Sequence, residues 1–266
     1  MIIDAHTHLF ASNIAKIAIP KLSNISKIEP FTDGTKEDAI VKMKQNNIDK
    51  AVVYSVATKP NAESKINDYL LQLDKNIFIP FGAINPFSED LVKILNFIKN
   101  NNFKGIKLHP QYQNFELMQK ELCFLYDACI DLDLIVTFHA GWDVAYPTCE
   151  NANAVCFAKM LDKYYNLKAI LAHFGGLRQG KEVINYLAGR KNICFDTAIC
   201  KENLPLEIAN EIIKKHGSDK IFFGTDCPWD NFASFIAYLK KLDLSEQEFD
   251  NIMSKNLIKF LNLNAK

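Results

Sequence analysis

Eight short apolar segments, each followed by a stretch with helical periodicity, constrain the fold of this chain most. Most of them are continuous apolar runs rather than alternating ones, which is typical of parallel strands buried on both faces. Between the segments, residues 88–101, 116–130 and 203–215 carry apolar side chains at the spacing of one helix face. The eight expected strands cover residues 1–6, 50–56, 77–84, 103–109, 134–139, 168–173, 192–197 and 220–225.

A strand followed by a helix, repeated eight times, predicts an α/β fold, namely a single (β/α)8 barrel of the TIM type. The length of 266 residues fits one domain over 1–266, because such barrels have about 250 residues. An open doubly wound sheet is the alternative, but it would place a glycine-rich phosphate turn after the first strand. The sequence there is His6-Thr7-His8-Leu9-Phe10. We expect residues 245–263 to form an extra C-terminal helical segment on the outside.

Charge and cysteine usage exclude several classes of protein. Lys plus Arg and Asp plus Glu number 31 each, so we expect neither nucleic acid nor an anionic membrane as a partner. The chain shows neither an apolar run of about 20 residues nor a signal peptide, and we expect a cytoplasmic protein. Seven cysteines without a Cys-x-x-Cys favour neither a disulfide framework nor a thiolate zinc site. The sequence leaves the oligomeric state open, a homodimer included.

Polar side chains gather at the carboxyl ends of the expected strands, where a barrel has its active site. Five of the six histidines lie there, and the sixth, His216, ends an expected helix, where a cation is favoured. Side chains two apart on a strand project to the same side, so His6 and His8 are placed to share one metal ion. Two long connections, residues 11–35 and 141–150, would overhang the same end of the barrel. The strand-end residues are His6, His8, Lys107, His109, His139, His173 and Asp226.

Five stretches carry a family resemblance: residues 3–8 (IDAHTH), 103–110 (FKGIKLHP), 138–141 (FHAG), 172–176 (AHFGG) and 224–229 (GTDCPW). With them the chain resembles the amidohydrolase superfamily, and most closely the small amidohydrolase-related branch. That branch includes aminocarboxymuconate-semialdehyde decarboxylase, resorcylate decarboxylases and dicarboxylate lactonases. The resemblance implies a distorted barrel that holds one divalent metal ion, commonly zinc, on His6, His8, His139 and Asp226. It also implies that His173 is a catalytic group near the metal.

Three imidazoles and one carboxylate leave an open position on Zn²⁺, and a water bound there has a pKa near ~7. Asp226 could then accept the proton of the attacking water, while His173 polarises a carbonyl or acts as an acid or base. We therefore expect hydrolysis of an amide, ester or lactone bond in a small molecule. Non-oxidative decarboxylation of a small unsaturated or aromatic carboxylic acid is the alternative. A catalytically silent metal-binding barrel is the third hypothesis.

Three further residues are candidates for supporting the metal. Asp4 and Asp196 lie on or at the ends of expected strands, where a carboxylate could orient a ligand. In binuclear members of the superfamily a carboxylated lysine at the end of the fourth strand bridges two metals, so Lys107 leaves a two-metal site as an alternative. The context of Lys107 resembles the mononuclear branch more closely.

Substrate contacts are predicted from the same end of the barrel. His109 shares a strand face with Lys107 and could contact the substrate, and Trp142 could line an aromatic pocket. Arg178 is one of only two arginines in a lysine-rich chain, and a planar guanidinium suits a substrate carboxylate. A small molecule, with a carboxylate as one option, is therefore the expected partner.

Overall fold

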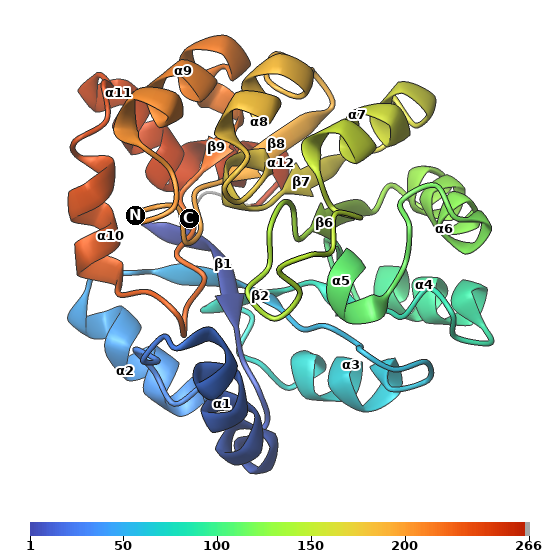
Figure 1. Cartoon of the computed structure of the whole chain (residues 1–266). Coiled ribbons are helices and arrows are strands. Elements are labelled where there is room, and N and C mark those ends of the chain that lie inside the picture. Colours follow the sequence, from blue (N-terminus) through green and yellow to red (C-terminus); the bar gives the residue numbers. More distant parts are fainter. Residues whose placement is uncertain (264–266) are drawn as a thin grey trace.

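Parallel strands form the centre of the structure and helices surround them (Figure 1). The structure is a computed structural model that describes residues 1–263. Each strand pairs in parallel with its neighbours. The strands are β1 (Ile3–His8), β2 (Lys50–Tyr54), β3 (Phe78–Pro80), β4 (Gly82–Ala83), β5 (Gly105–Leu108), β6 (Ile135–Phe138), β7 (Ala169–Leu171), β8 (Ile193–Asp196) and β9 (Ile221–Phe222).

Two sheets join into one closed barrel. The sheets have the orders β1-β2-β3 and β4-β5-β6-β7-β8-β9. β3 and β4 are two halves of one expected strand, because only Phe81 separates them. The first and last strands, β1 and β9, also meet. The N–H of Ala5 in β1 donates to the carbonyl of Phe223, directly after β9, at 2.7 Å. The predicted eight-stranded α/β barrel is therefore confirmed.

Helices follow the strands in the predicted alternation, and additional helices lie after β1 and β5. The connection over residues 11–35, expected as a long loop, contains α1 (Ser12–Ser26), whose Ala15 and Ile19 are buried. The remaining helices are α2 (Lys36–Gln45), α3 (Glu63–Leu71), α4 (Leu91–Asn100), α5 (Pro110–Gln113), α6 (Lys120–Asp131), α7 (Ala154–Lys163), α8 (Gly180–Tyr186), α9 (Leu206–His216), α10 (Phe232–Leu239), α11 (Glu246–Asp250) and α12 (Asn256–Phe260), with shorter turns η1 (His173–Gly175), η2 (Ser218–Lys220) and η3 (Asn251–Lys255).

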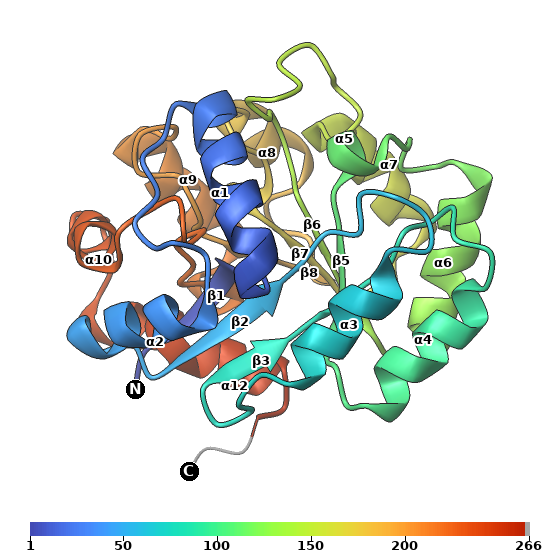
Figure 2. The same cartoon turned by 90° about the horizontal axis from the view of Figure 1, so that it is seen from below.

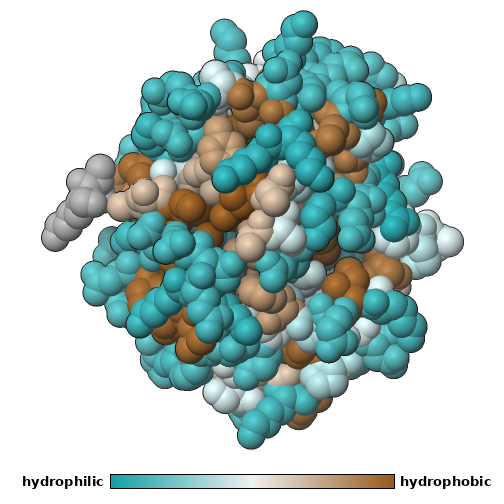
Figure 3. Space-filling model, turned by 90° about the vertical axis from the view of Figure 1, so that its left-hand side faces the viewer, coloured by the Kyte–Doolittle hydropathy of each residue, from teal (hydrophilic) through white to brown (hydrophobic). Residues whose placement is uncertain are grey.

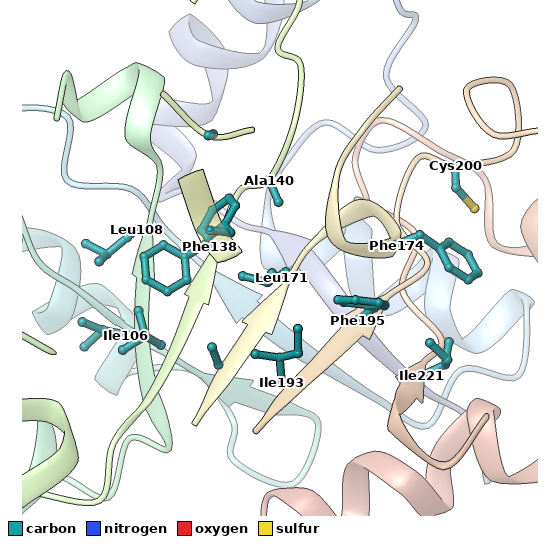
Figure 4. Close-up of a cluster of buried hydrophobic side chains, with 14 of the residues drawn as sticks. Ile106, Leu108, Phe138, Ala140, Leu171, Phe174, Ile193, Phe195, Cys200 and Ile221 are labelled. Carbon is teal, nitrogen blue, oxygen red and sulfur yellow. The ribbon is translucent and has the colours of Figure 1, made fainter. Parts of the chain in front are cut away.

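The larger hydrophobic core lies between the barrel and its helices. Figure 4 shows part of it on β5 to β9, where Ile106, Leu108, Phe138, Leu171 and Phe195 project from the strands. All five side chains are fully buried. Burial of apolar area on this scale is the main stabilising contribution to such a fold, and it explains why these strands read as continuous apolar runs.

A change of register in β1 decides which of its side chains face the inside of the barrel. Ile3 pairs with Lys50 and His8 with Tyr54, and the pairing shifts between Asp4 and Thr7. Such a bulge reverses the alternation of side chains along a strand. Ile3 therefore joins the inner hydrophobic cluster, and His8 still faces inward.

The bulge also moves Asp4 away from the position expected for it. The Asp4 carboxylate accepts hydrogen bonds from the Thr225 hydroxyl at 2.5 Å and from the backbone N–H of His6 at 2.9 Å. The Asp4 carboxylate contacts neither the imidazole of His6 nor that of His8. Regular alternation does not hold across the bulge, so Asp4 contacts the backbone of His6 and not the imidazole that it was expected to orient.

The C-terminal segment closes the end of the barrel opposite the strand ends. Figure 2 shows α12 at the bottom and the connection from β6 to α7 at the top. Leu257 and Leu261 of this segment belong to the inner hydrophobic cluster. The N–H of Phe223, next to β9, donates to the carbonyl of Ile252 in η3 at 3.0 Å. The extra helical segment is present as predicted, but it plugs the barrel instead of lying on the outside.

The face shown in Figure 3 is largely hydrophilic, with several apolar patches between the hydrophilic side chains. Within residues 1–263, none of the helices is both long and apolar enough to cross a membrane.

His216 ends α9 as predicted, but it is not a cation there. Its side chain is buried and stacks on Phe195 with ring centroids 4.1 Å apart. Its Nδ1 accepts the N–H of Gly189 at 3.1 Å, and its Nε2 lies 3.2 Å from the carbonyl of Ile193. Burial, with a smaller effect of the Lys220 charge, lowers the pKa of His216 to about 3. The attraction between a positive charge and the C-terminal end of a helix is outweighed by the loss of solvation that the buried charge would suffer.

Burial of neutral His216 predicts a pH dependence of stability. The unfolded chain binds this proton near pH 6.5 and the folded chain does not, so the contribution of His216 is present above pH 6.5 and is lost as the pH falls. Between pH 6.5 and 5.0 we expect it to cost about 1.5 kcal/mol of the free energy of unfolding. His216→Gln should remove this part of the pH dependence in urea unfolding. Equal pH dependence in both proteins would show that His216 is protonated in the folded state.

Candidate metal centre and its surroundings

Three of the four predicted metal ligands converge on one point. His6 and His8 lie on β1, and Asp226 lies after β9, the strand next to β1 in the closed barrel. The Nε2 atoms of the two histidines are 3.2 Å apart, and Asp226 Oδ1 lies 2.9 Å from His8 Nε2 and 3.4 Å from His6 Nε2. The three residues form a group whose geometry suits a bound metal ion.

The outer nitrogen of each histidine faces an acceptor. His6 Nδ1 lies 2.8 Å from Asp196 Oδ2, and His8 Nδ1 lies 3.1 Å from the carbonyl oxygen of Tyr54. An acceptor at Nδ1 holds the proton of a neutral ring on that nitrogen and leaves Nε2 bare. Burial, together with the charge of Lys107, lowers the pKa of His6 to about 4, so this ring is neutral. His6 therefore presents a lone pair to the point where the two rings meet, and the neutral form of His8 presents a second one there.

Asp226 supplies a third lone pair to the same point. Its Oδ1 is buried and has no hydrogen-bond partner among the described residues. Asp226 has a φ of 70°, a costly conformation for a residue with a side chain. A divalent cation would satisfy the three facing lone pairs, so these residues fit the metal that the family implies.

Asp196 couples this group to its surroundings. It lies at the end of β8 and is fully buried. One carboxylate oxygen contacts His6, and the other accepts the backbone N–H groups of His173 at 2.9 Å and Ala198 at 3.1 Å. Burial alone would raise the pKa of Asp196, but His6 outweighs it and lowers the pKa. The charged carboxylate sets the tautomer of His6 and the position of His173.

His173 lies beside the group, on η1 directly after β7. Its ring stacks on that of His6 with centroids 5.4 Å apart. Its Nδ1 is 3.0 Å from the carbonyl of Ala198, and its Nε2 is 3.0 Å from His139 Nδ1. The backbone of His173 has a φ of 61°. The structure thus places His173 next to the candidate metal centre, as the sequence predicts.

His139, the fourth predicted ligand, lies outside the group of His6, His8 and Asp226. Its ring is parallel to that of His109, with centroids 4.1 Å apart and an interplanar angle of 6°. The donor atoms of His109, His139 and Asp143 form a second group that could hold a cation. Asp143 lies in the long connection over residues 141–150, and the sequence predicts no role for it. The only signal was its place four residues after a strand-end histidine.

Lys107 reaches the first group from β5. Its ammonium lies 3.4 Å from His6 Nε2 and 4.8 Å from the centroid of the Tyr54 ring. Burial lowers the pKa of Lys107 to about 8, although Asp196 and Asp226 act in the opposite direction. The lysine faces inward, and it contacts His6 and not the group of His109, His139 and Asp143.

Trp142 and Arg178 lie together at the mouth. The guanidinium of Arg178 stacks on the Trp142 ring, 3.8 Å from its centroid, and its Nε donates to Asn203 Oδ1 at 2.9 Å. Arg178 is exposed, and the Trp142 carbonyl lies 3.3 Å from His139 Nε2. The guanidinium therefore packs on a residue whose backbone contacts His139, and it remains accessible from solvent.

Gly141 makes this arrangement possible, because it turns the chain sharply after β6. Its φ is 89°, and a Cβ there would lie 2.1 Å from the backbone nitrogen of Leu177. The N–H of Gly141 donates to the carbonyl of Ala152 at 2.7 Å, which closes the loop that carries Trp142 and Asp143. Only glycine fits this turn.

Taken together, the barrel and the histidines and carboxylates at its carboxyl end define a class of α/β-barrel enzymes. The sequence profile described as amidohydrolase matches residues 3–263. The chain belongs to this family. The resemblance to the amidohydrolase superfamily is thereby confirmed. A search of curated proteins by sequence gives no match.

Solved structures with the same fold share little sequence with the chain. An uncharacterised TIM-barrel protein from Bordetella bronchiseptica has a TM-score of 0.80 at 16% identity, over 98% of both chains. A dihydroxybenzoic acid decarboxylase from Polaromonas sp. JS666, with bound manganese and the inhibitor 2-nitroresorcinol, has a TM-score of 0.75 at 15% identity, over 100% of this chain and 98% of that one. A 5-carboxyvanillate decarboxylase from Novosphingobium aromaticivorans, complexed with manganese, has a TM-score of 0.72 at 14% identity, over 99% and 96%.

These neighbours contradict the expected hydrolysis of an amide, ester or lactone. Further solved structures with the same fold are also decarboxylases of dihydroxybenzoate or carboxyvanillate. The ligand set led to the wrong expectation, because a metal ion on histidines and a carboxylate can serve either reaction. The comparisons support decarboxylation, the alternative that the resemblance allowed.

The turn at Gly141 predicts the effect of adding one methyl group. Gly141→Ala should destabilise the protein through both its φ and the contact with Leu177. The matched control is Gly189→Ala, which has a φ of 94° but whose Cβ would meet only the Lys215 carbonyl at 3.5 Å. In urea unfolding we expect the control to lose about 1–2 kcal/mol of the free energy of unfolding. Gly141→Ala should lose roughly 1–3 kcal/mol more. Equal losses of stability in the two variants would show that the loop moves to accommodate the methyl group without a further cost.

Proposed function

We propose that the protein is a metal-dependent decarboxylase of a small aromatic or unsaturated carboxylic acid. The observation that carries the proposal is the convergence of three donor atoms, from His6, His8 and Asp226, beside His173. A cation-binding site of this kind at the mouth of the barrel agrees with manganese in two of the neighbouring decarboxylases. The reaction type is taken from those neighbours.

His6, His8 and Asp226 would hold one divalent metal ion. Two imidazoles and a carboxylate suit several first-row ions, so Zn²⁺ remains our prediction and Mn²⁺ is the ion named in the neighbours. When bound, the metal would neutralise and orient an anionic oxygen of the substrate. Asp196 keeps Nε2 of His6 free for this role by accepting a hydrogen bond from Nδ1. Loading would also require Lys107 to withdraw or to lose its proton.

The mouth offers groups for an aromatic acid. Tyr112 packs edge-on against His109 and Tyr146, with centroids 4.4 and 5.2 Å apart, and the Trp142 ring lies under Arg178. Aromatic rings favour an unsaturated substrate ring. The Arg178 guanidinium, with Nη atoms not engaged by Asn203, suits a carboxylate.

The reaction replaces a carboxylate by a proton. The substrate carbon that carries the carboxylate takes up one proton, the bond from this carbon to the carboxylate carbon breaks, and CO₂ leaves. We assign delivery of the proton to His173, through the Nε2 atom, because this ring lies against His6. In the structure that atom contacts His139, so the contact must open when substrate binds. Solvent then returns the proton to His173, which restores the site.

A panel of acids tests the proposal. Protein loaded with Mn²⁺ or Zn²⁺ is incubated with dihydroxybenzoates, carboxyvanillate-type acids and simple lactones and amides, and CO₂ and the decarboxylated arene are measured. We expect CO₂ and arene in equal amounts from at least one hydroxybenzoate, and none without metal. His173→Asn should lower the rate by about 10²–10⁴-fold while the metal stays bound. Metal-dependent hydrolysis without CO₂ release would overturn the proposal.

Arg178 has a matched control in the only other arginine of the chain. Arg178→Ala should raise KM for the acid by roughly 10- to 100-fold, the effect of losing a hydrogen bond to a charged group. Arg190, which pairs with Asp162 at 2.7 Å, serves as the control, and Arg190→Ala should leave KM unchanged. Steady-state kinetics with the best acid of the panel measures both. An unchanged KM in Arg178→Ala would remove this residue from the substrate site.

Asp196→Asn tests whether the tautomer of His6 matters. The amide keeps an acceptor for the backbone N–H of His173 but turns an NH₂ group toward His6 Nδ1, which favours a proton on Nε2. We expect metal affinity to fall by about 10- to 100-fold, measured by competition with a chromophoric chelator. Exposed Asp68 provides the control variant, Asp68→Asn. Unchanged affinity in Asp196→Asn would show that Asp196 has only a structural role.

A further inference from the structure

We propose that Asn203 is a positioning residue for substrate binding. It holds the guanidinium of Arg178 at the mouth of the barrel without neutralising its charge, which leaves the two Nη atoms free for a carboxylate of the substrate. The inference rests on the role that the proposed function gives to Arg178, and not on which bond of the substrate breaks. Asn203 lies between β8 and α9, where the sequence predicts no functional residue.

The backbone at Arg178 is fixed by the connection that follows β6. The N–H of Leu177 donates to the carbonyl of Ala140 at 2.9 Å, and the Leu177 carbonyl accepts the N–H of Trp142 at 3.1 Å. Leu177 and Gly141 thus form a parallel bridge beyond the ends of β6 and β7. Arg178 has a φ of 62°, a costly conformation for a residue with a side chain. The bridge therefore holds the start of the arginine side chain in one place.

Two neighbours hold the other end of this side chain. The Trp142 ring lies 3.8 Å from the centre of the guanidinium, and Asn203 Oδ1 accepts the hydrogen of Arg178 Nε at 2.9 Å. A stack acts over the whole face of the ring, so it fixes the plane of the guanidinium but not the direction of its Nη edge. A hydrogen bond is directional. The bond to Asn203 therefore determines where the Nη atoms point.

The orientation of the Asn203 amide follows from its two contacts. Its Nδ2 donates to the carbonyl of Ile199 at 3.0 Å, and its Oδ1 accepts from Arg178. A carbonyl oxygen can only accept and the guanidinium Nε can only donate, so a flipped amide would lose both hydrogen bonds. The backbone N–H of Asn203 also donates to the carbonyl of Cys200 at 2.9 Å. Both ends of the amide are used, and the side chain is a rigid support.

The connection that carries Asn203 is itself tied to the segment after β9. Lys201 Nζ lies 2.8 Å from Asp230 Oδ1 and 3.2 Å from Ser234 Oγ. The Tyr238 hydroxyl of α10 donates to the carbonyl of Leu204 at 3.3 Å. Asn203 lies between these two attachments, so the hydrogen bond to Arg178 joins the guanidinium to a fixed part of the rim.

The two arginines of the chain differ in what holds them. Arg190 Nη1 pairs with the Asp162 carboxylate at 2.7 Å, so its charge is balanced. Arg178 is held by a neutral amide, and it forms no ion pair within residues 1–263. An oriented guanidinium with free Nη atoms offers two parallel donors to a carboxylate, and little side-chain entropy remains to be lost on binding. A carboxylate at position 203 would hold the guanidinium but compete with the substrate for its charge.

Arginine side-chain NMR tests whether Asn203 holds Arg178, because the chain has only two arginines. The zinc-loaded, ¹⁵N-labelled full chain should show two Nε–H signals, which Arg178→Ala and Arg190→Ala assign. In Asn203→Ala we expect the Nε hydrogen of Arg178 to exchange with water at least about 10-fold faster, since its acceptor is lost. The Arg190 signal should not change. Unchanged exchange at Arg178 would overturn the inference.

Binding of benzoate, measured by calorimetry on the zinc-loaded protein, tests the consequence for an anionic ligand. We expect Asn203→Ala to weaken binding by about 3- to 10-fold, because the guanidinium must be ordered on binding. Asn203→Asp should weaken it by at least about 10-fold, because the new carboxylate takes the charge. Exposed Asn100 at the end of α4 gives the controls, Asn100→Ala and Asn100→Asp, which should bind as the wild type does.

A double variant separates positioning from a general structural effect. In the Arg178→Ala background, Asn203→Ala should cause no further loss of benzoate affinity, because Asn203 acts through Arg178. A further loss of the same size as in the wild type would overturn the inference. So would benzoate affinity in Asn203→Asp equal to that of the wild type, or no shift of the Arg178 Nε–H signal at millimolar benzoate. No bond of benzoate needs to break, so these results are independent of the decarboxylation panel.

Discussion

The candidate metal centre depends on one buried carboxylate, that of Asp196. This side chain holds His6 from the first strand and the backbone of His173 from the turn after β7. A carboxylate that is fully buried is costly unless its acceptor positions are filled, and here backbone N–H groups and an imidazole fill them. Because Asp196 fixes the proton of His6 on Nδ1, the nitrogen that faces Asp226 is free to bind a cation. The strained φ values of His173 and Asp226 are held in place around this contact.

Sequence alone predicted the barrel, because each strand is buried on both faces and the apolar runs are therefore unbroken. It also predicted which residues lie at the strand ends, since parallel strands of a barrel end at one rim. The details that failed depend on contacts distant in the chain. The bulge in β1 turned Asp4 away, burial kept His216 neutral, and α12 entered the bottom of the barrel. None of these leaves a local pattern in the sequence, because each is decided by what packs against the residue.

The same limit applies to the site. Motif resemblance grouped His139 with His6, His8 and Asp226, whereas the structure brings His139 against His109 and Asp143. The difference follows from the loop after Gly141, whose conformation no periodicity reveals. Reaction type was also out of reach, since a Lewis-acidic ion held by imidazoles serves hydrolysis and decarboxylation alike. What separates the two is the substrate that the mouth accepts, and our proposal of an aromatic acid rests on the Trp142–Arg178 stack and the tyrosines there.

The central claim is that lone pairs from His6, His8 and Asp226 meet at one cation-binding point. Anomalous diffraction from crystals of the manganese-loaded protein, recorded above and below the manganese absorption edge, tests it most directly. The account predicts a strong anomalous peak within coordinating distance of Nε2 of both histidines and of Oδ1 of Asp226. Absence of a peak at that point in fully loaded crystals, or hydrogen-bonded water there instead, would contradict the account.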